Sequence, residues 1–143
     1  MPSLPAALAH LGLAPHPEGG WFRETHRSAH CTVIDFVLLP GEVSAWHRVS
    51  HGEEVWMHHR GGSLTLHQWR PGEAPSHTEL GPDCATSVVP QGTWQAAEPT
   101  GKAWVWVSCV VAPPFAFEHF ELASASLEVP PPLVHLLPGA DRG

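Results

Sequence analysis

Short runs of alternating apolar and polar residues fill the chain from Trp21 onward, and a turn signal separates each run from the next. Alternation with a period of two is typical of β-strands that bury one face. The spacing of the runs, about 8–12 residues, predicts an all-β sandwich or barrel. The predicted strands are 21–27, 31–39, 44–49, 54–60, 63–70, 76–80, 86–89, 93–97, 103–112 and 117–122.

One short helix is predicted before the first strand. Ser3 can cap its N-terminus, and Pro5 falls in the first turn, where a missing N–H group does little harm. Gly12 follows as a residue suited to the C-terminal end of the helix. Three leucines at helical spacing form its apolar stripe: Leu4, Leu8 and Leu11.

The length of the chain fits one domain. It has 143 residues, of which 43% are hydrophobic, and this is enough for a core of its own. We expect a single domain over residues 1–125, including the short helix, and a C-terminal tail over residues 126–143. Because the tail is rich in proline, we expect it to lie extended over the surface or to be partly disordered.

The charge balance excludes several classes of partner. The formal net charge is -7, and Lys102 is the only lysine. Nucleic acids and anionic membranes need clustered basic residues, so neither is expected as a partner. The chain has no apolar run near the ~20 residues of a membrane helix, and its first residues lack the basic leader of a signal peptide. We therefore expect a cytoplasmic protein.

Two predicted strands that follow each other carry the most informative polar residues, His47 and Glu54. Trp56 and His58 share the strand phase of Glu54. If both strands turn these faces inward, the imidazole of His47 and the carboxylate of Glu54 lie beside each other across a hairpin inside the barrel. An imidazole with a carboxylate is the start of either a metal site or an acid–base pair.

Further candidate residues lie on other predicted strands. Gln95 follows a proline–glycine turn and is expected to point into the same interior. Arg23 and Glu24 are neighbours on the first strand, so one of them faces inward; an inward Arg23 would offer a fork for a carboxylate or phosphate. Most other histidines are expected to be surface or structural groups: His10, His16, His30, His67, His77, His119 and His135.

At this point the sequence resembles a known family, the cupin superfamily. Gly41, His47, Glu54 and Gly61 stand at the spacings of the first cupin motif, with Val49 in place of its second histidine. The second motif is similar around residues 90–99, where Gln95 replaces the histidine and Pro99 the asparagine.

The closer resemblance is to a small single-domain cupin branch whose biochemical role is largely unassigned. It rests on HPEGGWFRE at 16–24, SAWHR at 44–48, VPQGTWQ at 89–95 and VAPPFAF at 111–117. Together these segments span roughly residues 11–123. The resemblance implies a double-stranded β-helix, the jelly-roll barrel of cupins, which is often dimeric.

In cupins three histidines and one glutamate hold a divalent metal inside the barrel. Carried over by position, His47, Glu54 and Gln95 remain as metal ligands for Zn, Fe, Mn or Ni, whereas Val49 cannot bind a metal. Two strong ligands and an amide fall short of the usual three or four. No cofactor is therefore assigned with certainty.

Four functions stay open at this stage, the last of which is a purely structural or storage-like barrel with a filled interior and no pocket. The first is a small-molecule-binding cupin whose ligand is a carboxylate, a sugar or a nucleotide derivative, held by His47, Glu54 and Gln95. Further binding residues would be Arg23, Glu24, Trp56 and His58. The second is a metal-independent isomerase or epimerase with His47 and Glu54 as catalytic residues, because sugar epimerases of this fold use a histidine base. The chain, however, has no tyrosine to act as the acid.

The third function is a metal-dependent cupin enzyme, so whether the protein is an enzyme is left undecided. The expected macromolecular partner is a second copy of the chain in a homodimer. The apolar strand at 103–112 could supply its interface.

Overall fold

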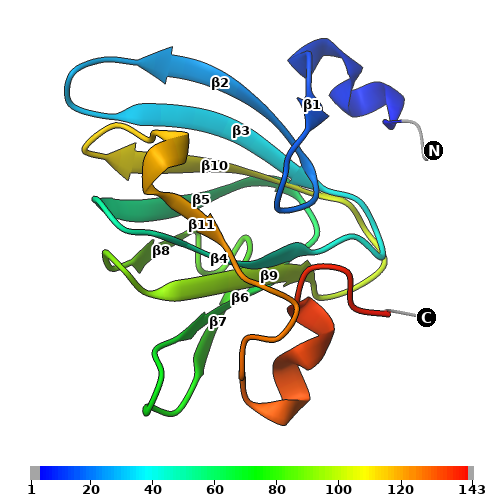
Figure 1. The fold of residues 1–143 in the computed structure, drawn as a ribbon. Coiled ribbons are helices and arrows are strands. Elements are labelled where there is room, and N and C mark those ends of the chain that lie inside the picture. The colour runs from blue at the N-terminus through cyan, green and yellow to red at the C-terminus, as the bar shows by residue number, and fades with distance from the viewer. Residues whose placement is uncertain (1–3, 142–143) are drawn as a thin grey trace.

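Two antiparallel sheets form the molecule in the computed structural model, which describes residues 4–141. Figure 1 shows the sheets facing each other as the two walls of a barrel. The six-stranded sheet has the order β1-β2-β3-β10-β5-β8, and the five-stranded sheet has the order β11-β4-β9-β6-β7.

The strands of the six-stranded sheet are β1 (Ala14–Pro15), β2 (Trp21–Arg27), β3 (Thr32–Leu38), β5 (Glu53–Gly61), β8 (Thr86–Val89) and β10 (Val105–Ala112). Those of the five-stranded sheet are β4 (Ser44–Val49), β6 (Leu64–Trp69), β7 (Ser76–Leu80), β9 (Trp94–Pro99) and β11 (Phe120–Leu122). From β3 onward the chain crosses repeatedly between the two sheets, the winding of a double-stranded β-helix. The predicted all-β fold is confirmed.

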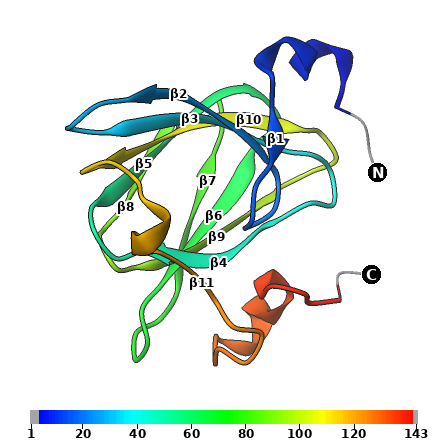
Figure 2. The same cartoon turned by 45° about the horizontal axis from the view of Figure 1, so that its top comes forward.

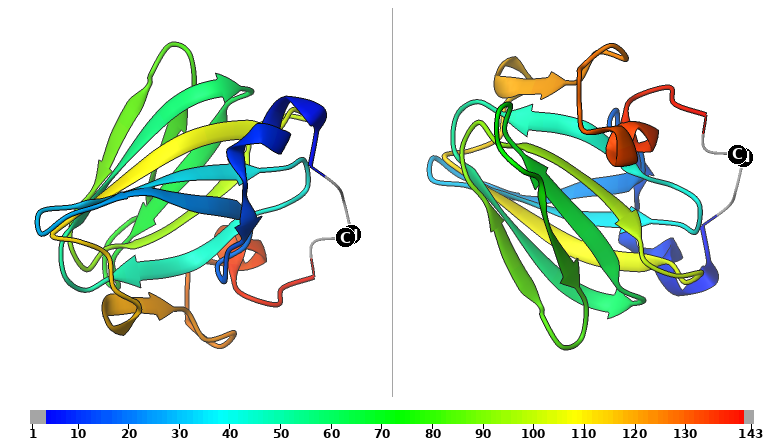
Figure 3. Two further views of the ribbon diagram at one scale, coloured as in Figure 1. Left: turned by 90° about the horizontal axis from the view of Figure 1, so that it is seen from above. Right: turned by 90° about the horizontal axis from the view of Figure 1, so that it is seen from below.

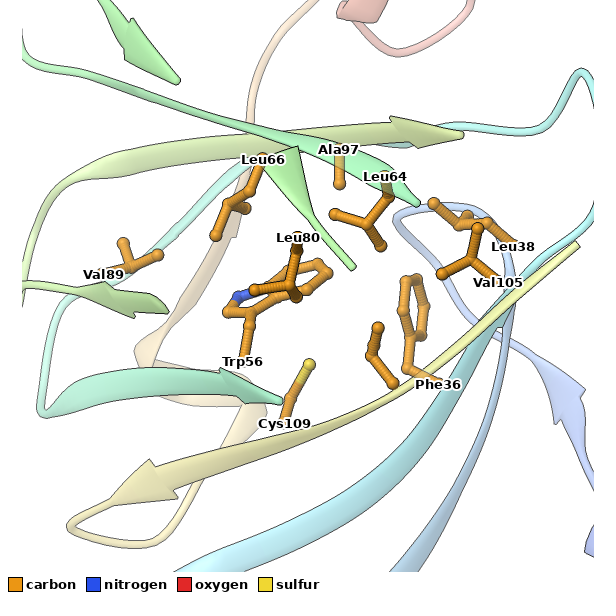
Figure 4. Close-up of a cluster of buried hydrophobic side chains, with 11 residues drawn as sticks. Phe36, Leu38, Trp56, Leu64, Leu66, Leu80, Val89, Ala97, Val105 and Cys109 are labelled. Atoms are coloured by element: carbon orange, nitrogen blue, oxygen red, sulfur yellow. The ribbon is translucent and has the colours of Figure 1, made fainter. Parts of the chain in front are cut away.

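The main core lies between the sheets because the apolar residues of the alternating strands in both sheets face the barrel interior. Figure 4 shows Phe36, Trp56 and Leu80 pointing toward one another between strands of both walls. Figure 2 shows the strands of the two sheets arranged around the barrel interior. This packing occupies one part of the barrel interior and leaves the polar residues described below in another part.

The N-terminal helix differs from the prediction in type and in its capping. It is a 3-10 helix, η1 (Ala6–Leu11), which follows Pro5 without a side-chain cap. Ser3, the predicted cap, lies outside the described residues. Gly12 ends the helix with a left-handed φ of 65°, as the sequence predicts.

The outer face of the six-stranded sheet is covered by this N-terminal segment. Leu8 and Leu11 pack with Val37, while Trp104 and Trp106 border the same cluster. In addition, β10 lies between β3 and β5, so it has no free edge. The apolar strand expected to form a dimer interface is thus paired and partly covered within the chain, and the homodimer stays a prediction.

The C-terminal segment is folded against the barrel and is not the extended or disordered tail expected from its prolines. It forms a 3-10 helix, η3 (Pro131–Leu136), with prolines in the first turn. Proline fits there because the first turn needs no intrahelical N–H donor. Figure 3 shows η3 at the outer surface near β4.

Apolar residues of this segment complete a second core cluster on the outside of the five-stranded sheet. Leu136 and Leu137 pack there with Trp46 and Trp69. The indole N–H of Trp46 donates a hydrogen bond of 3.1 Å to the carbonyl oxygen of Leu133. The remaining predicted strand, 117–122, is divided into a short 3-10 helix, η2 (Phe117–His119), and β11.

No helix within residues 4–141 has the length and apolar character needed to cross a membrane.

Candidate functional site

A cavity of about 100 Å³ lies between the two sheets, beside the main core. It has polar groups on part of its wall and aromatic or aliphatic side chains on the rest. The lining residues are His16, Glu18, Phe22, Glu24, Arg27, Thr32, Ile34, His47, Val49, Glu54, Cys109, Val111, Phe115, Ala116, Phe117 and Phe120.

His47 and Glu54 both line this cavity, but they do not face each other across a hairpin. His47 is 2% exposed on β4, and Glu54 is 7% exposed on β5. These two strands belong to different sheets, since β4 pairs with β9 and β11. The predicted hairpin is therefore wrong: the turn at Gly52 carries the chain from one wall of the barrel to the other.

The imidazole of His47 is held by a carboxylate that the sequence analysis did not select. Its Nδ1 lies 2.6 Å from Oε2 of Glu18 and 2.7 Å from the carbonyl oxygen of Ala45. Ser44 donates a hydrogen bond of 2.8 Å to the same carboxylate oxygen. No hydrogen bond to Nε2 is formed within residues 4–141, so this nitrogen remains for a ligand.

Glu18 reaches the site from the loop between β1 and β2. The amide of Ala45 donates a hydrogen bond of 2.7 Å to the carbonyl oxygen of Glu18. Gly19 follows with a φ of +106°, and a Cβ there would lie 2.1 Å from the carbonyl oxygen of Val43. The His-Pro-Glu-Gly-Gly segment therefore lets the loop lie flat against β4. This segment was visible in the sequence, but only as part of a resemblance.

Opposite charges stabilise each other in this buried pair. Burial by itself lowers the pKa of His47, yet the charge and hydrogen bond of Glu18, with the charge of Glu54, raise that pKa to about 9. Burial raises the pKa of Glu18, but His47 outweighs this effect and the net shift is downward. At neutral pH His47 is thus an imidazolium that is paired with the Glu18 carboxylate.

Glu54 has a different protonation state, because its environment is less favourable to charge. Burial raises its pKa to about 7, although the charge of His47 and a hydrogen bond from Gln95 oppose the shift. The Gln95 amide donates to Glu54 at 2.9 Å and accepts from the indole of Trp56 at 2.8 Å. Near neutral pH Glu54 can therefore either hold or release a proton inside the cavity.

His16 is another cavity residue, although the sequence analysis expected a surface or structural role. Its side chain is 6% exposed, and its Nδ1 lies 3.3 Å from Oε1 of Glu18. Burial lowers the pKa of His16, and the charge of Glu18 only partly offsets this. His16 is consequently a neutral ring beside the charged pair.

Four of the predicted binding residues, among them Gln95, lie outside the cavity lining. Trp56 is buried in the core and orients Gln95. His58 is bonded through Nε2 to the carbonyl oxygen of Gly62, at 2.8 Å. Arg23 faces away from the cavity, where its guanidinium meets the carbonyl oxygen of Leu11.

A β-bulge explains which residues of β2 face inward. The pairing of β2 with β3 shifts register between Glu24 and His26, which places Glu24 and Arg27 on the cavity side. The side chains of these two residues form an ion pair of 2.7 Å at the rim. Strict alternation would instead have placed Arg27 on the same side as Arg23. Sequence reasoning missed Arg27 because nothing in the strand pattern marks the bulge.

Aromatic residues cover the other side of the rim. Phe115, Phe117 and Phe120 pack edge to face with one another. Phe117 remains 60% exposed next to the cavity. Phe120 also lies near the imidazole of His47, with 5.6 Å between the ring centroids.

The donor set does not fit the metal site that the resemblance implies. Because the Trp56 indole can only donate, the oxygen of Gln95 must face Trp56, and its amide nitrogen faces Glu54. Gln95 thus offers no oxygen at the position of the missing histidine ligand, and Val49 offers none either. Within residues 4–141, no three His, Cys, Asp or Glu side chains are placed to hold a metal ion.

Comparisons with known proteins agree with this fold. Residues 6–123 match the family model described as Cupin superfamily (DUF985). A protein from Shewanella oneidensis is 32% identical, with a TM-score of 0.78 and 83% of each chain covered. A hypothetical protein from Leishmania major is 26% identical, with a TM-score of 0.76; the match covers 83% of this chain and 86% of that one.

A third solved structure supports the fold alone. It is an uncharacterized conserved protein with a double-stranded β-helix domain from Klebsiella pneumoniae, with 23% identity and a TM-score of 0.61. The match covers 77% of this chain and 84% of that one. Among curated proteins none matches the sequence.

Proposed function

Since the chain belongs to the cupin superfamily, in the family described as DUF985, we propose that its barrel cavity binds a small polar organic molecule. One observation carries this proposal: two polar groups face the cavity. The first is the oriented imidazolium of His47, whose Nε2 makes no hydrogen bond within residues 4–141, and the second is the carboxyl group of Glu54, which titrates near neutral pH. A few polar groups that converge in an otherwise apolar pocket are typical of a ligand site.

The size of the cavity limits what enters it. A volume of about 100 Å³ cannot enclose a nucleotide or a whole disaccharide, because pockets for drug-sized ligands measure roughly 300–1,000 Å³. We expect a small carboxylate, or one end of a sugar or nucleotide derivative, to reach His47 and Glu54.

A second candidate function is favoured by the pKa of Glu54. A base with a pKa near the working pH is efficient in proton transfer. As a carboxylate, Glu54 would take the proton from a carbon next to a carbonyl group, and the electrons of the C–H bond would move into that carbonyl. The oxygen would accept a hydrogen bond from Nε2–H of His47. Return of the proton to another face or another carbon gives an epimer or isomer.

The two candidates are tested together with three variants: His47→Gln, Glu54→Gln and, as a control on the exposed surface, His59→Gln. A thermal-shift screen of carboxylates, sugars and nucleotide derivatives should give hits with the parent protein and the control. We expect His47→Gln to lose these hits. The binding proposal fails if no compound binds, or if His47→Gln binds equally well.

Proton transfer has its own readout. For any compound that binds, NMR in deuterated water should show exchange of a C–H proton in the presence of the parent protein. Glu54→Gln should retain binding and lose the exchange. If a compound binds to the parent protein but its C–H proton does not exchange, the isomerase proposal is wrong and only the binding proposal stands.

The homodimer and the cytoplasmic location belong to this proposal as well. Light scattering coupled to size exclusion measures the first, and fractionation of the source cells measures the second.

A further inference from the structure

Arg27 gives the cavity a cationic rim. Among the cavity-lining residues of the described chain, it is the only arginine, and no lysine lines the cavity. The bulge in β2 turns it inward, whereas Arg23 on the same strand faces away. The arginine fork that the sequence suggested at position 23 is therefore found at position 27.

The guanidinium of Arg27 is oriented but retains free donors. Its Nε and Nη2 donate to the carboxylate of Glu24 at 3.1 and 2.7 Å, and Nη2 also reaches the carbonyl oxygen of Phe115 at 3.0 Å. A guanidinium has five N–H groups, and the two on Nη1 have no acceptor within residues 4–141. Arg27 is half-exposed, so a ligand can reach it.

Apolar side chains form much of the remaining wall of the cavity that Arg27 shares with His47 and Glu54. Ile34, Val49 and Val111 belong to this wall, and His47 with Glu54 stand in the interior. An apolar cavity of about 150 Å³ can hold a benzene molecule, so about 100 Å³ has room for roughly four heavy atoms. A ligand that contacts both Arg27 at the rim and His47 in the interior therefore has a short carbon chain with an oxygen group at each end.

We propose that the ligand is a short-chain hydroxy or oxo carboxylic acid. Its carboxylate binds the free edge of Arg27 at the rim, and its hydroxyl or carbonyl oxygen meets Nε2 of His47 beside Glu54. This assignment rests on the proposed function of the cavity and names the class of its ligand. A single negative charge fits better than a phosphate dianion, because Glu24, Glu54 and Glu18 also line the cavity.

The test compares two acids, 4-oxobutanoate and 4-hydroxybutanoate, with their uncharged amides. Titration calorimetry gives the affinity of the parent protein, Arg27→Gln, Arg27→Lys and the control Arg23→Gln. Hydrogen bonds to charged groups predict that the acids bind the parent about tenfold more tightly than the amides. Arg27→Gln should abolish this preference, Arg27→Lys should keep part of it, and Arg23→Gln should keep it fully.

The ratio of acid to amide affinity separates ligand binding from a structural role. If Arg27→Gln weakens acid and amide equally, Arg27 only supports the loop at Phe115, and the proposal is overturned. It is also overturned if neither acid binds the parent protein. A neutral sugar that binds through His47 and is insensitive to Arg27→Gln would uphold the proposed function and reject this ligand class. Thermal melts of each variant confirm that it is folded.

Discussion

At the scale of single residues, the site depends on two carboxylates in different states. Glu18 is held as an anion by the imidazolium of His47, while Glu54 stands at the other wall with a pKa of about 7. The environment of each carboxylate therefore sets its state: Glu18 positions and charges His47, and under the proposed function Glu54 would exchange protons. Such a separation of pKa values is what acid–base chemistry at neutral pH requires.

The pKa of His47 predicts a specific dependence of stability on pH. Its pKa is about 9 in the folded protein and ordinarily 6.5, so between these values the folded state binds more protons than the unfolded state. The free energy of unfolding should be highest below pH 6.5 with respect to this group and should fall as the pH rises to 9. Urea denaturation between pH 8 and 9, where Glu54 is largely ionised, measures the decline.

A double variant, Glu18→Gln with His47→Gln, isolates this contribution. Because the charges of His47 and Glu18 act on the pKa of Glu54 in opposite directions, removing both disturbs Glu54 less than removing one. The stability of this variant should fall less than that of the parent between pH 8 and 9. His59→Gln, which removes an exposed imidazole, should keep the decline of the parent. A parent profile that rises over this interval would contradict the buried ion pair.

Residue spacing predicted part of this site and could not predict the rest. His47, Glu54 and Gln95 stand at periodic positions on strands, so alternation could place them inward. Glu18 comes from a loop, where no periodicity indicates direction. Arg27 was missed because the bulge in β2 inserts a residue that leaves no signal in the pattern of apolar positions.

At the scale of elements, the two 3-10 helices at the ends of the described chain cover the outer faces of the sheets. On the C-terminal side, η3 completes a cluster that contains Trp46 and Trp69. Its proline content suggested a loose tail because proline favours extended backbone. The leucines between the prolines decide the outcome, since they pack against indole rings on the sheet.

A matched pair of variants tests whether η3 is part of the core. Leu136 is 0% exposed, whereas Val134 on the same helix is 46% exposed. Leu136→Ala should lower the free energy of unfolding by about 2–5 kcal/mol, the usual cost of emptying a buried leucine site. Val134→Ala should change it by about 0.5 kcal/mol or less. Equal effects in urea denaturation would show that the segment does not pack as described.

At the scale of the whole molecule, the order of strands was predictable because turn residues separate them so regularly. The boundaries of β2, β4, β7 and β8 coincide with the predicted ranges. What the sequence could not give is the assignment of strands to sheets, which made β4 and β5 look like a hairpin. Pairing partners depend on contacts between residues far apart in the chain, and local patterns carry no record of them.

The N-terminal cover predicts how the whole molecule associates. A chain that lacks residues 2–12 uncovers the apolar surface around Val37 and Trp106. Exposed apolar patches of this kind promote association. We expect the shortened chain to form larger species as its concentration rises, measured by light scattering. Ala9→Asp, at an exposed position of the same helix, should behave like the parent. A shortened chain with the parent's mass at every concentration would contradict this expectation.

The loop that carries Glu18 belongs to neither sheet, yet it determines the charge of a histidine on the barrel wall. If the loop moves away, His47 loses the carboxylate that keeps its proton, and burial then favours the neutral ring. The wall itself does not have to change for this to happen. Related barrels that keep every wall residue but differ in this one loop should therefore perform different chemistry within the same architecture.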